Sequence, residues 1–217
     1  MKKLLTIGDS FTAGEELPSQ NLAWPVLLAN KLGWSVTNLG ESASCNQKMM
    51  RKLVSTPIEQ YDLIVILWSH FDRFEIADDV GIFDAWPGGN RTFFRNEAPW
   101  RPTIIDYWNR HHNDDYAYRQ YLMNVILAQS YIKSHGKKYI MADAFGNHEN
   151  PGRHAEINQD LLGQIDSYNF LGWPNKSTFE WVGSAPRGSG GHYLEEGHEI
   201  VAEKFYQHAT NMLEIKE

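Results

Sequence analysis

Apolar residues recur along the chain in short runs that are separated by longer amphipathic segments. Four of these runs have the length and pattern of β-strands, at residues 4–7, 34–39, 62–68 and 138–143. The run at 62–68 is apolar on both faces, as is typical of a central strand in a parallel sheet. We therefore expect a sheet that is buried on both sides.

Apolar positions at helical spacing fill most of the segments between these strands. They predict helices at residues 24–32, through Met49 and Leu53, at about 115–134, and near the C-terminus on a stripe of Val201, Phe205, Ala209 and Met212. We expect Asn46 to cap the second helix, and Asp114 or Asp115 to cap the third. Strands that alternate with helices favour an α/β fold, in which helices cover a mostly parallel sheet.

Composition sets limits on the kind of protein this is. A chain of 217 residues suits a single domain spanning 1–217, and a net charge of −7 argues against nucleic acid or an anionic membrane as a partner. No apolar run reaches the length of a membrane span, and Met1-Lys2-Lys3 leads straight into a strand. We expect a cytoplasmic protein whose oligomeric state the sequence leaves open.

The sequence gives little indication of a metal site or of a reactive thiol. Cys45 is the single cysteine, so no intrachain disulfide forms, and we interpret it as a packing residue. His111 and His112 are adjacent and therefore point apart, which favours a solvated loop over a metal site. We expect neither a metal nor a cofactor.

Residues 74–113 show no sustained period and include Pro87-Gly88-Gly89. A long irregular stretch in a compact domain is usually functional or without fixed structure, and we interpret this one as a loop-rich insertion that acts as a lid or binds substrate. The chain has eight Trp, ten Tyr and ten Phe, several of them between Phe71 and Trp108. These aromatic side chains either stack on sugar rings or extend a small core.

The first strand ends in Gly8-Asp9-Ser10, which places a hydroxyl at the edge of the sheet where α/β proteins bind ligands. A second chemical group, His192, lies in a glycine-rich loop before the last helix. Together with blocks after the second and third strands, these residues resemble the GDSL esterase/lipase family, also called SGNH hydrolases. The resemblance implies a flavodoxin-like three-layer α/β/α sandwich and ester hydrolysis, with Ser10 as nucleophile, Asp9 in support and His192 as base.

The resemblance also implies an oxyanion hole, in which hydrogen-bond donors stabilise the negative charge of the reacting carbonyl oxygen. The backbone N–H of Ser10 is one donor. The glycine that supplies a second N–H in this family falls on Ala43 here, with Gly40 as the alternative. Where the family carries an asparagine after the third strand, this chain has Ser69 or His70, and either side chain can donate.

The acid that orients the catalytic histidine is where the pattern departs most. In the resembled family an aspartate stands three residues before the histidine, but Ser189 occupies that position. Three interpretations follow: a Ser–His dyad, a carboxylate from elsewhere such as Glu195 or Asp143, or loss of catalysis. We expect His198, within the last helix, to support His192.

We accordingly predict a serine esterase that needs no cofactor. The aromatic content favours a small-molecule or carbohydrate O-acetyl ester as substrate. The alternative from another class is a catalytically degenerate module of the same fold that binds carbohydrate or serves a structural role, because the acid, the glycine and the asparagine of the family pattern are all replaced.

Overall fold

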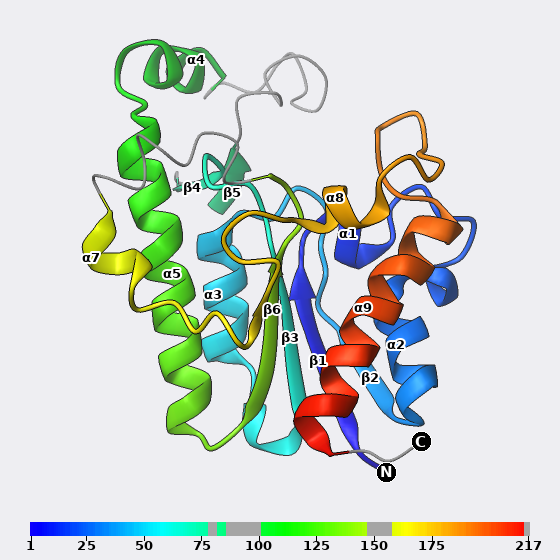
Figure 1. The fold of residues 1–217 in the computed structure, drawn as a ribbon. Coiled ribbons are helices and arrows are strands. Elements are labelled where there is room, and N and C mark those ends of the chain that lie inside the picture. The colour runs from blue at the N-terminus through cyan, green and yellow to red at the C-terminus, as the bar shows by residue number, and fades with distance from the viewer. Residues whose placement is uncertain (78–81, 86–100, 147–157, 215–217) are drawn as a thin grey trace.

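The computed structural model describes residues 1–77, 82–85, 101–146 and 158–214 (Figure 1). Within these residues a parallel sheet has the strand order β2-β1-β3-β6-β7. Its strands are β1 (Lys3–Gly8), β2 (Ser35–Asn38), β3 (Leu63–Trp68), β6 (Lys138–Asp143) and β7 (Phe170–Leu171). The first four match the predicted strands, whereas β7 has only two residues and leaves no periodic signal in the sequence.

Helices cover both faces of this sheet, which confirms the predicted α/β/α sandwich (Figure 1). Helices α3 (Asn46–Ser55) and α5 (Asp114–Ser134) lie on one face, and α2 (Trp24–Leu32) and α9 (Glu195–Leu213) lie on the other. Alternate strand residues serve the two layers: Leu5, Ile7, Ile64 and Ile66 pack toward α3 and α5, and Leu4, Leu63, Val65 and Leu67 toward α2 and α9. The predicted double burial of the central strands follows from this alternation.

Two expected helix caps are wrong. Asn46 is the first residue of α3 rather than its cap, and its amide oxygen instead accepts the backbone N–H of Ser69 at 2.9 Å. Helix α5 is capped by Asn113, whose side chain accepts from the N–H of Tyr116, while Asp114 and Asp115 occupy the first turn. Acidic side chains are favourable in that turn too, because of the helix dipole, so the sequence signal did not separate the two positions.

The insertion at 74–113 is more regular than expected. Its described parts form an antiparallel hairpin, β4 (Phe74–Ala77) and β5 (Ile82–Ala85), followed by α4 (Arg101–Arg110); residues 78–81 and 86–100 lie outside the described chain. Each of these strands carries an acidic residue, Glu75 or Asp84, of a kind that is depleted in strands, so their apolar pattern is weak and the segment resembled a loop.

The hairpin is fastened to α3, and its aromatic residues pack among themselves. Lys48 of α3 forms an ion pair with Asp84 of β5 at 2.9 Å. The ring of Phe74 lies 5.0 Å from that of Tyr107 and 5.5 Å from that of Trp108. These three rings are partly buried and pack against one another outside the two cores that flank the sheet.

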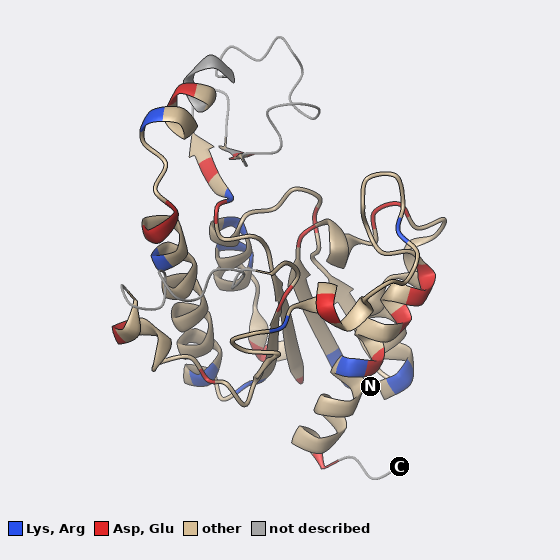
Figure 2. Cartoon of the chain, turned by 45° about the horizontal axis from the view of Figure 1, so that its top comes forward, with Lys and Arg blue, Asp and Glu red and all other residues tan. Residues whose placement is uncertain are grey.

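Short helical segments complete the described chain. They are α1 (Ser10–Ala13), η1 (Gln20–Leu22), η2 (Ile58–Gln60), α7 (Gln159–Leu162) and α8 (Thr178–Val182). None of the described helices combines the length and apolar character that crossing a bilayer requires. Basic and acidic residues are interspersed along the described elements (Figure 2).

The short helix α1 carries Ser10 and is braced by the segment that follows β2. Asn38 donates its amide N–H to the carbonyl of Thr12 at 2.9 Å, and its amide oxygen accepts the N–H of Gly40 at 2.9 Å. A Cβ on Gly40 would lie 2.5 Å from the backbone nitrogen of Ala13 and 2.6 Å from the carbonyl carbon of Thr12. Only glycine allows this close approach to the backbone of α1.

We predict that Gly40→Ala lowers the free energy of unfolding by about 1–3 kcal/mol, because the added methyl group meets backbone that cannot rotate away. Urea unfolding followed by circular dichroism measures the change. Gly163→Ala is the matched control, since its Cβ would come no closer than 4.0 Å to the carbonyl of Gln159. Equal unfolding free energies for the two variants would contradict the bracing role of Gly40.

Candidate active site

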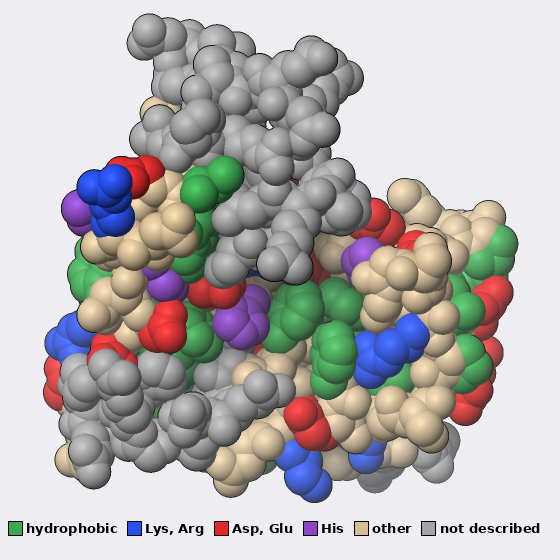
Figure 3. Space-filling view, turned by 90° about the horizontal axis from the view of Figure 1, so that it is seen from above, with side chains coloured by type: hydrophobic (Ala, Val, Ile, Leu, Met, Phe, Trp, Pro, Cys, Tyr) green, Lys and Arg blue, Asp and Glu red, His purple; other side chains and the backbone are tan. Residues whose placement is uncertain are grey.

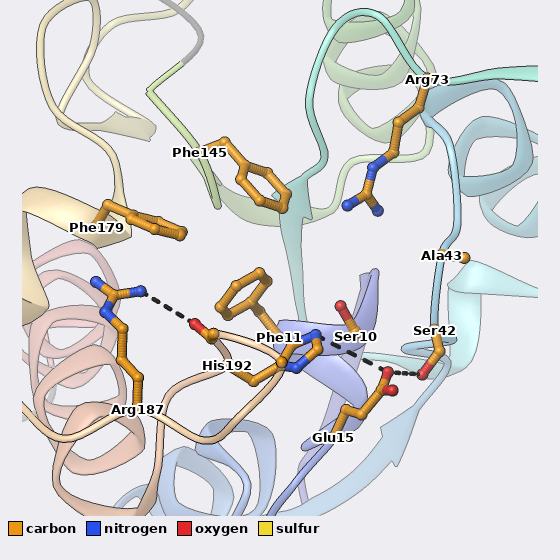
Figure 4. Close-up of a pocket in the computed structure, with 12 residues that line it drawn as sticks. Ser10, Phe11, Glu15, Ser42, Ala43, Arg73, Phe145, Phe179, Arg187 and His192 are labelled. Atoms are coloured by element: carbon orange, nitrogen blue, oxygen red, sulfur yellow. Dashed lines mark hydrogen bonds and ion pairs between the residues drawn. The ribbon is translucent and has the colours of Figure 1, made fainter. Parts of the chain in front are cut away.

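A cavity of about 390 Å³ lies at the carboxyl ends of the parallel strands. Segments from across the chain line it: the turn after β1, the loops after β2, β3 and β6, and the loop before α9 (Figure 4). The chain passes from β1 to β2 on one side and returns to β3 on the other, so this is the switch point where open α/β sheets bind ligands. Seen from above, hydrophobic side chains lie beside histidine and basic side chains on this face (Figure 3).

Ser10 is the first residue of α1 and lines this cavity. Asp9 caps the helix by accepting the N–H of Phe11 at 3.1 Å, and Gly14, at φ 80°, ends it after a single turn. This turn separates the strand from the next segment and presents the Ser10 side chain to the cavity (Figure 4).

Glu16, which the sequence analysis did not single out, binds the loop that carries His192. Its Oε2 accepts from Nδ1 of His192 at 2.8 Å and from the His192 backbone N–H at 3.2 Å. Its Oε1 accepts from the Gly190 N–H at 2.7 Å and the Ser189 hydroxyl at 3.0 Å. One carboxylate thus receives four hydrogen bonds from three residues of the loop, two of them from His192.

These bonds keep the Glu16 carboxylate in its charged form. The N–H of Gly190 and the ring of His192 lower the pKa of Glu16 to about 2, so the carboxylate is ionised at neutral pH. An ionised carboxylate accepts a proton-bearing Nδ1, which leaves Nε2 of the neutral imidazole unprotonated. This tautomer is the one that can act as a base.

Two glycines let the loop close around the Glu16 carboxylate. A Cβ on Gly188 would lie 2.5 Å from Cδ of Glu16, and one on Gly190 would lie 3.0 Å from its Oε2. Glu16 itself has φ 67°, a left-handed conformation that costs a residue with a side chain about 1–2 kcal/mol. The glycine-rich stretch before His192 therefore wraps an anion, which is the one sequence signal that could have pointed to Glu16.

The three carboxyl or hydroxyl groups considered from sequence lie elsewhere. Ser189, at the position of the family's aspartate, donates to Glu16 and has no hydrogen bond with the His192 ring among the described contacts. Asp143 accepts a hydrogen bond from the hydroxyl of Tyr121 at 2.6 Å, and Glu195 is exposed at the start of α9. None of the three has the contact with Nδ1 that Glu16 makes.

A second glutamate borders the other ring nitrogen of His192. Oε2 of Glu15 lies 3.9 Å from Nε2, and the same carboxylate accepts a hydrogen bond from the hydroxyl of Ser42 (Figure 4). The two consecutive glutamates therefore flank the imidazole.

Ala43, the predicted second oxyanion donor, lines the cavity. Its φ of 68° is the left-handed conformation that favours glycine, the residue the family pattern has at this position. No protein acceptor for its N–H exists within the described part of the chain. The alternative, Gly40, already donates its N–H to Asn38.

Ser69 and His70, the predicted side-chain donors, do not line the cavity; Arg73 does. Ser69 is fully buried and donates its hydroxyl to Oδ2 of Asp9 at 2.8 Å. Nδ1 of His70 pairs with the carboxylate of Asp72 at 2.6 Å. The prediction that Ser69 or His70 donates to the oxyanion is therefore wrong. Both side chains have other partners, Asp9 and Asp72, and the sequence pattern could not reveal them.

Asp9 is a buried charge-bearing group beside Ser10. Its side chain is fully inaccessible, and Oδ2 accepts from Arg73 at 3.2 Å as well as from Ser69. Burial raises the pKa of the Asp9 carboxyl, and the positive charge of Arg73 opposes this effect. Asp9 therefore connects the turn that holds Ser10 with the loop that holds Arg73.

One group of described residues has the composition of a metal site. Cys45, Glu75 and Asp84 each place a ligand atom within 4.8 Å of the others. Both carboxylates already form ion pairs, with Arg51 and Lys48, and burial raises the pKa of the Cys45 thiol. A protonated thiol beside neutralised carboxylates is a poor ligand set, so we assign it no cation.

His198 is a buried residue that links two helices. It is completely buried in α9, and its Nδ1 accepts the N–H of Trp24 at the start of α2. Burial lowers its pKa to about 4. His198 therefore stays neutral and joins the two helices behind His192.

The lowered pKa of His198 predicts a loss of stability in acid. Between pH 6.5 and pH 4 this histidine is protonated in the unfolded chain but not in the folded one, so stability falls as pH falls. The loss from pH 7 to pH 5 is about 2 kcal/mol at 1.4 kcal/mol per pH unit below 6.5. His198→Gln, whose amide oxygen can accept from Trp24, is expected to lack this component in urea unfolding at the two pH values. Parallel pH dependence in both proteins would contradict it.

Comparison with solved structures places this architecture in a known fold. The chain is similar to the esterase EstA from Pseudoalteromonas sp., with a TM-score of 0.58, 13% identity, and coverage of 99% of this chain and 100% of that one. It is also similar to a catalytic mutant of Axe2, an acetylxylan esterase from Geobacillus stearothermophilus, with a TM-score of 0.53, 17% identity, and coverage of 95% and 93%. A member of the lipolytic G-D-S-L family from Veillonella parvula matches with a TM-score of 0.52, 14% identity, and coverage of 95% and 97%. The chain has the fold of GDSL, or SGNH, hydrolases, as its sequence predicts.

Sequence comparison identifies the family. The chain belongs to a family of unknown function (DUF6071), whose model matches residues 12–217. The matched part begins just after Ser10, so the nucleophile candidate lies outside it. No curated protein matches the sequence.

Proposed function

We propose that this protein is a serine esterase that uses Ser10, His192 and Glu16. The observation that carries the proposal is the hydrogen bond from Nδ1 of His192 to Glu16 at 2.8 Å, at a cavity that both Ser10 and His192 line. Glu16 supplies the carboxylate that the family pattern has at the position of Ser189. A nucleophile, a base and a group that orients the base are the three parts that acyl transfer through serine requires.

The proposed reaction assigns each of these residues one step. Nε2 of His192 takes the proton of the Ser10 hydroxyl while Oγ bonds to the ester carbonyl carbon, and the carbonyl electron pair moves onto oxygen. The resulting imidazolium is stabilised by the ionised Glu16. As the carbonyl re-forms and the C–O bond to the alcohol breaks, the imidazolium gives its proton to the leaving oxygen, which leaves the acyl group on Ser10. Water then attacks the acyl group on Ser10 in the same manner. The backbone N–H of Ser10 and Ala43 are the proposed donors to the oxyanion.

A degenerate binding module is less well supported than an enzyme. The case for degeneracy rests on three replaced residues of the family pattern. Glu16 provides a carboxylate for the missing acid, and Ala43 has the backbone conformation of the missing glycine. These two replacements retain functional groups, which a decayed site has no reason to keep.

A small acyl group, such as the acetyl of a carbohydrate ester, is the substrate class that we propose. Three aromatic rings line the cavity: the ring of Phe145 lies 5.2 Å from that of Phe11 and 5.5 Å from that of Phe179. Such walls suit the apolar face of a sugar. An acetylxylan esterase is among the similar structures, which agrees with this choice.

We predict that the protein hydrolyses p-nitrophenyl acetate and reacts with a fluorophosphonate probe at Ser10, and that Ser10→Ala abolishes both. Steady-state rates and mass spectrometry of the labelled peptide measure the two effects. A folded wild-type protein that neither turns over nor labels would overturn the proposal. Faster turnover of p-nitrophenyl octanoate than of the acetate would contradict the acetyl assignment alone.

We further predict that Glu16→Gln lowers kcat by about 10²–10⁴-fold with KM within a few-fold, because an amide cannot stabilise the imidazolium by charge. The matched control is Glu195→Gln, which removes an exposed carboxylate that was the sequence-based candidate, and wild-type rates are expected from it. If instead Glu195→Gln is the inactive variant, the assignment of Glu16 is wrong.

A further inference from the structure

The loop after β3 brings a cation, not an amide or hydroxyl, to the wall of the cavity. Arg73 lines the cavity, with its guanidinium directed inward on the side of Ala43 (Figure 4). The side chains nearer to β3 have other partners, since Ser69 binds Asp9 and His70 binds Asp72. Among the described residues of this loop, Arg73 is the one whose side chain lines the cavity.

Contacts on several sides hold the guanidinium. Its NH1 group donates to Oδ2 of Asp9 at 3.2 Å and to the carbonyl of Ser44 at 3.5 Å, and its central carbon lies 4.9 Å from the ring centre of Phe145. The side chain is 13% exposed, so it has little freedom to move into water. A guanidinium has five N–H donors on a rigid plane, and the bond to Asp9 orients that plane.

Asp9 also links Arg73 to the nucleophile. The same carboxylate caps α1 through Phe11 and directly precedes Ser10 in the chain. The buried carboxylate of Asp9 therefore helps to position both the guanidinium of Arg73 and the turn that carries Ser10. A preorganised donor of this kind costs no rearrangement when charge develops in the reaction.

We propose that Arg73 is the side-chain donor of the oxyanion hole, which rests on the proposed function. As Oγ of Ser10 bonds to the carbonyl carbon, the carbonyl electron pair moves to oxygen, and an N–H of Arg73 donates a charge-assisted hydrogen bond to that oxygen. Arg73 keeps its proton throughout. The oxyanion hole then has three donors: the backbone N–H groups of Ser10 and Ala43 and the guanidinium of Arg73. The positive charge of Arg73 strengthens its hydrogen bond to the oxyanion.

The test compares Arg73→Gln and Arg73→Lys with wild type, using p-nitrophenyl acetate. We expect Arg73→Gln to lower kcat by about 10²–10³-fold while KM changes only a few-fold, and Arg73→Lys to recover part of the loss. Arg119→Gln is the matched control, because this arginine forms an exposed ion pair with Asp160, and it should retain the wild-type rate. Near-ultraviolet circular dichroism checks that each variant is folded; if Arg73→Gln is not, the charge-retaining lysine variant carries the comparison.

A second measurement separates an oxyanion donor from a residue that only supports the fold. A trifluoromethyl ketone forms a tetrahedral adduct with an oxyanion on serine, so its affinity should fall across the variants by the same factor as kcat/KM. Unchanged affinity, unchanged kcat, or a rise in KM alone would overturn this inference. If wild type is itself inactive and unlabelled, the proposed esterase fails and this inference fails with it; an active wild type with a fully active Arg73→Gln overturns the role of Arg73 alone.

Discussion

The candidate site depends on the hydrogen bonds between the carboxylate of Glu16 and the loop that carries His192. Glu16 lies shortly after the first strand, yet it binds a loop near the other end of the chain through four hydrogen bonds. Glu16 has a left-handed backbone, which is unfavourable for a residue with a side chain, and glycines surround its carboxylate. The four hydrogen bonds must offset the conformational free energy that this arrangement costs. Because the carboxylate reaches Nδ1, it also selects the tautomer of His192, so the same contact that holds the loop determines what the histidine can do.

A second carboxylate, Asp9, organises the opposite side of the cavity. A buried acid requires compensating donors, and here they come from the turn after β1 and the loop after β3. The raised pKa of Asp9 shows that burial still outweighs the attraction of Arg73. Glu16 and Asp9 thus flank Ser10 in sequence and connect it to the two segments whose side chains face the cavity, one carrying His192 and the other Arg73.

The parallel sheet explains why these segments meet. With the strand order β2-β1-β3-β6-β7, the carboxyl ends of β1 and β3 are neighbours at the point where the chain changes direction across the sheet. The turn with Ser10 and the loop with Arg73 emerge there side by side, and α9 packs against α2 to bring the preceding loop over them. This chain, a member of a family of unknown function, thereby shares its fold with solved esterases and a lipolytic G-D-S-L protein at identities of only 13–17%.

The sequence by itself determined the strands, the main helices and the three-layer class, because periodicity and burial on two faces are local properties of the chain. It also singled out Ser10, Ala43 and His192, which lie next to recognisable strand ends or glycines. Tertiary structure alone decided which carboxylate meets His192 and which side chain of the loop after β3 lines the cavity. Glu16 and Arg73 lie 176 and 64 positions from His192 and Asp9, the groups they bind. No local pattern records a contact of that separation. The hairpin strands at 74–77 and 82–85 were missed for a local reason, since an acidic residue in each interrupts the apolar pattern.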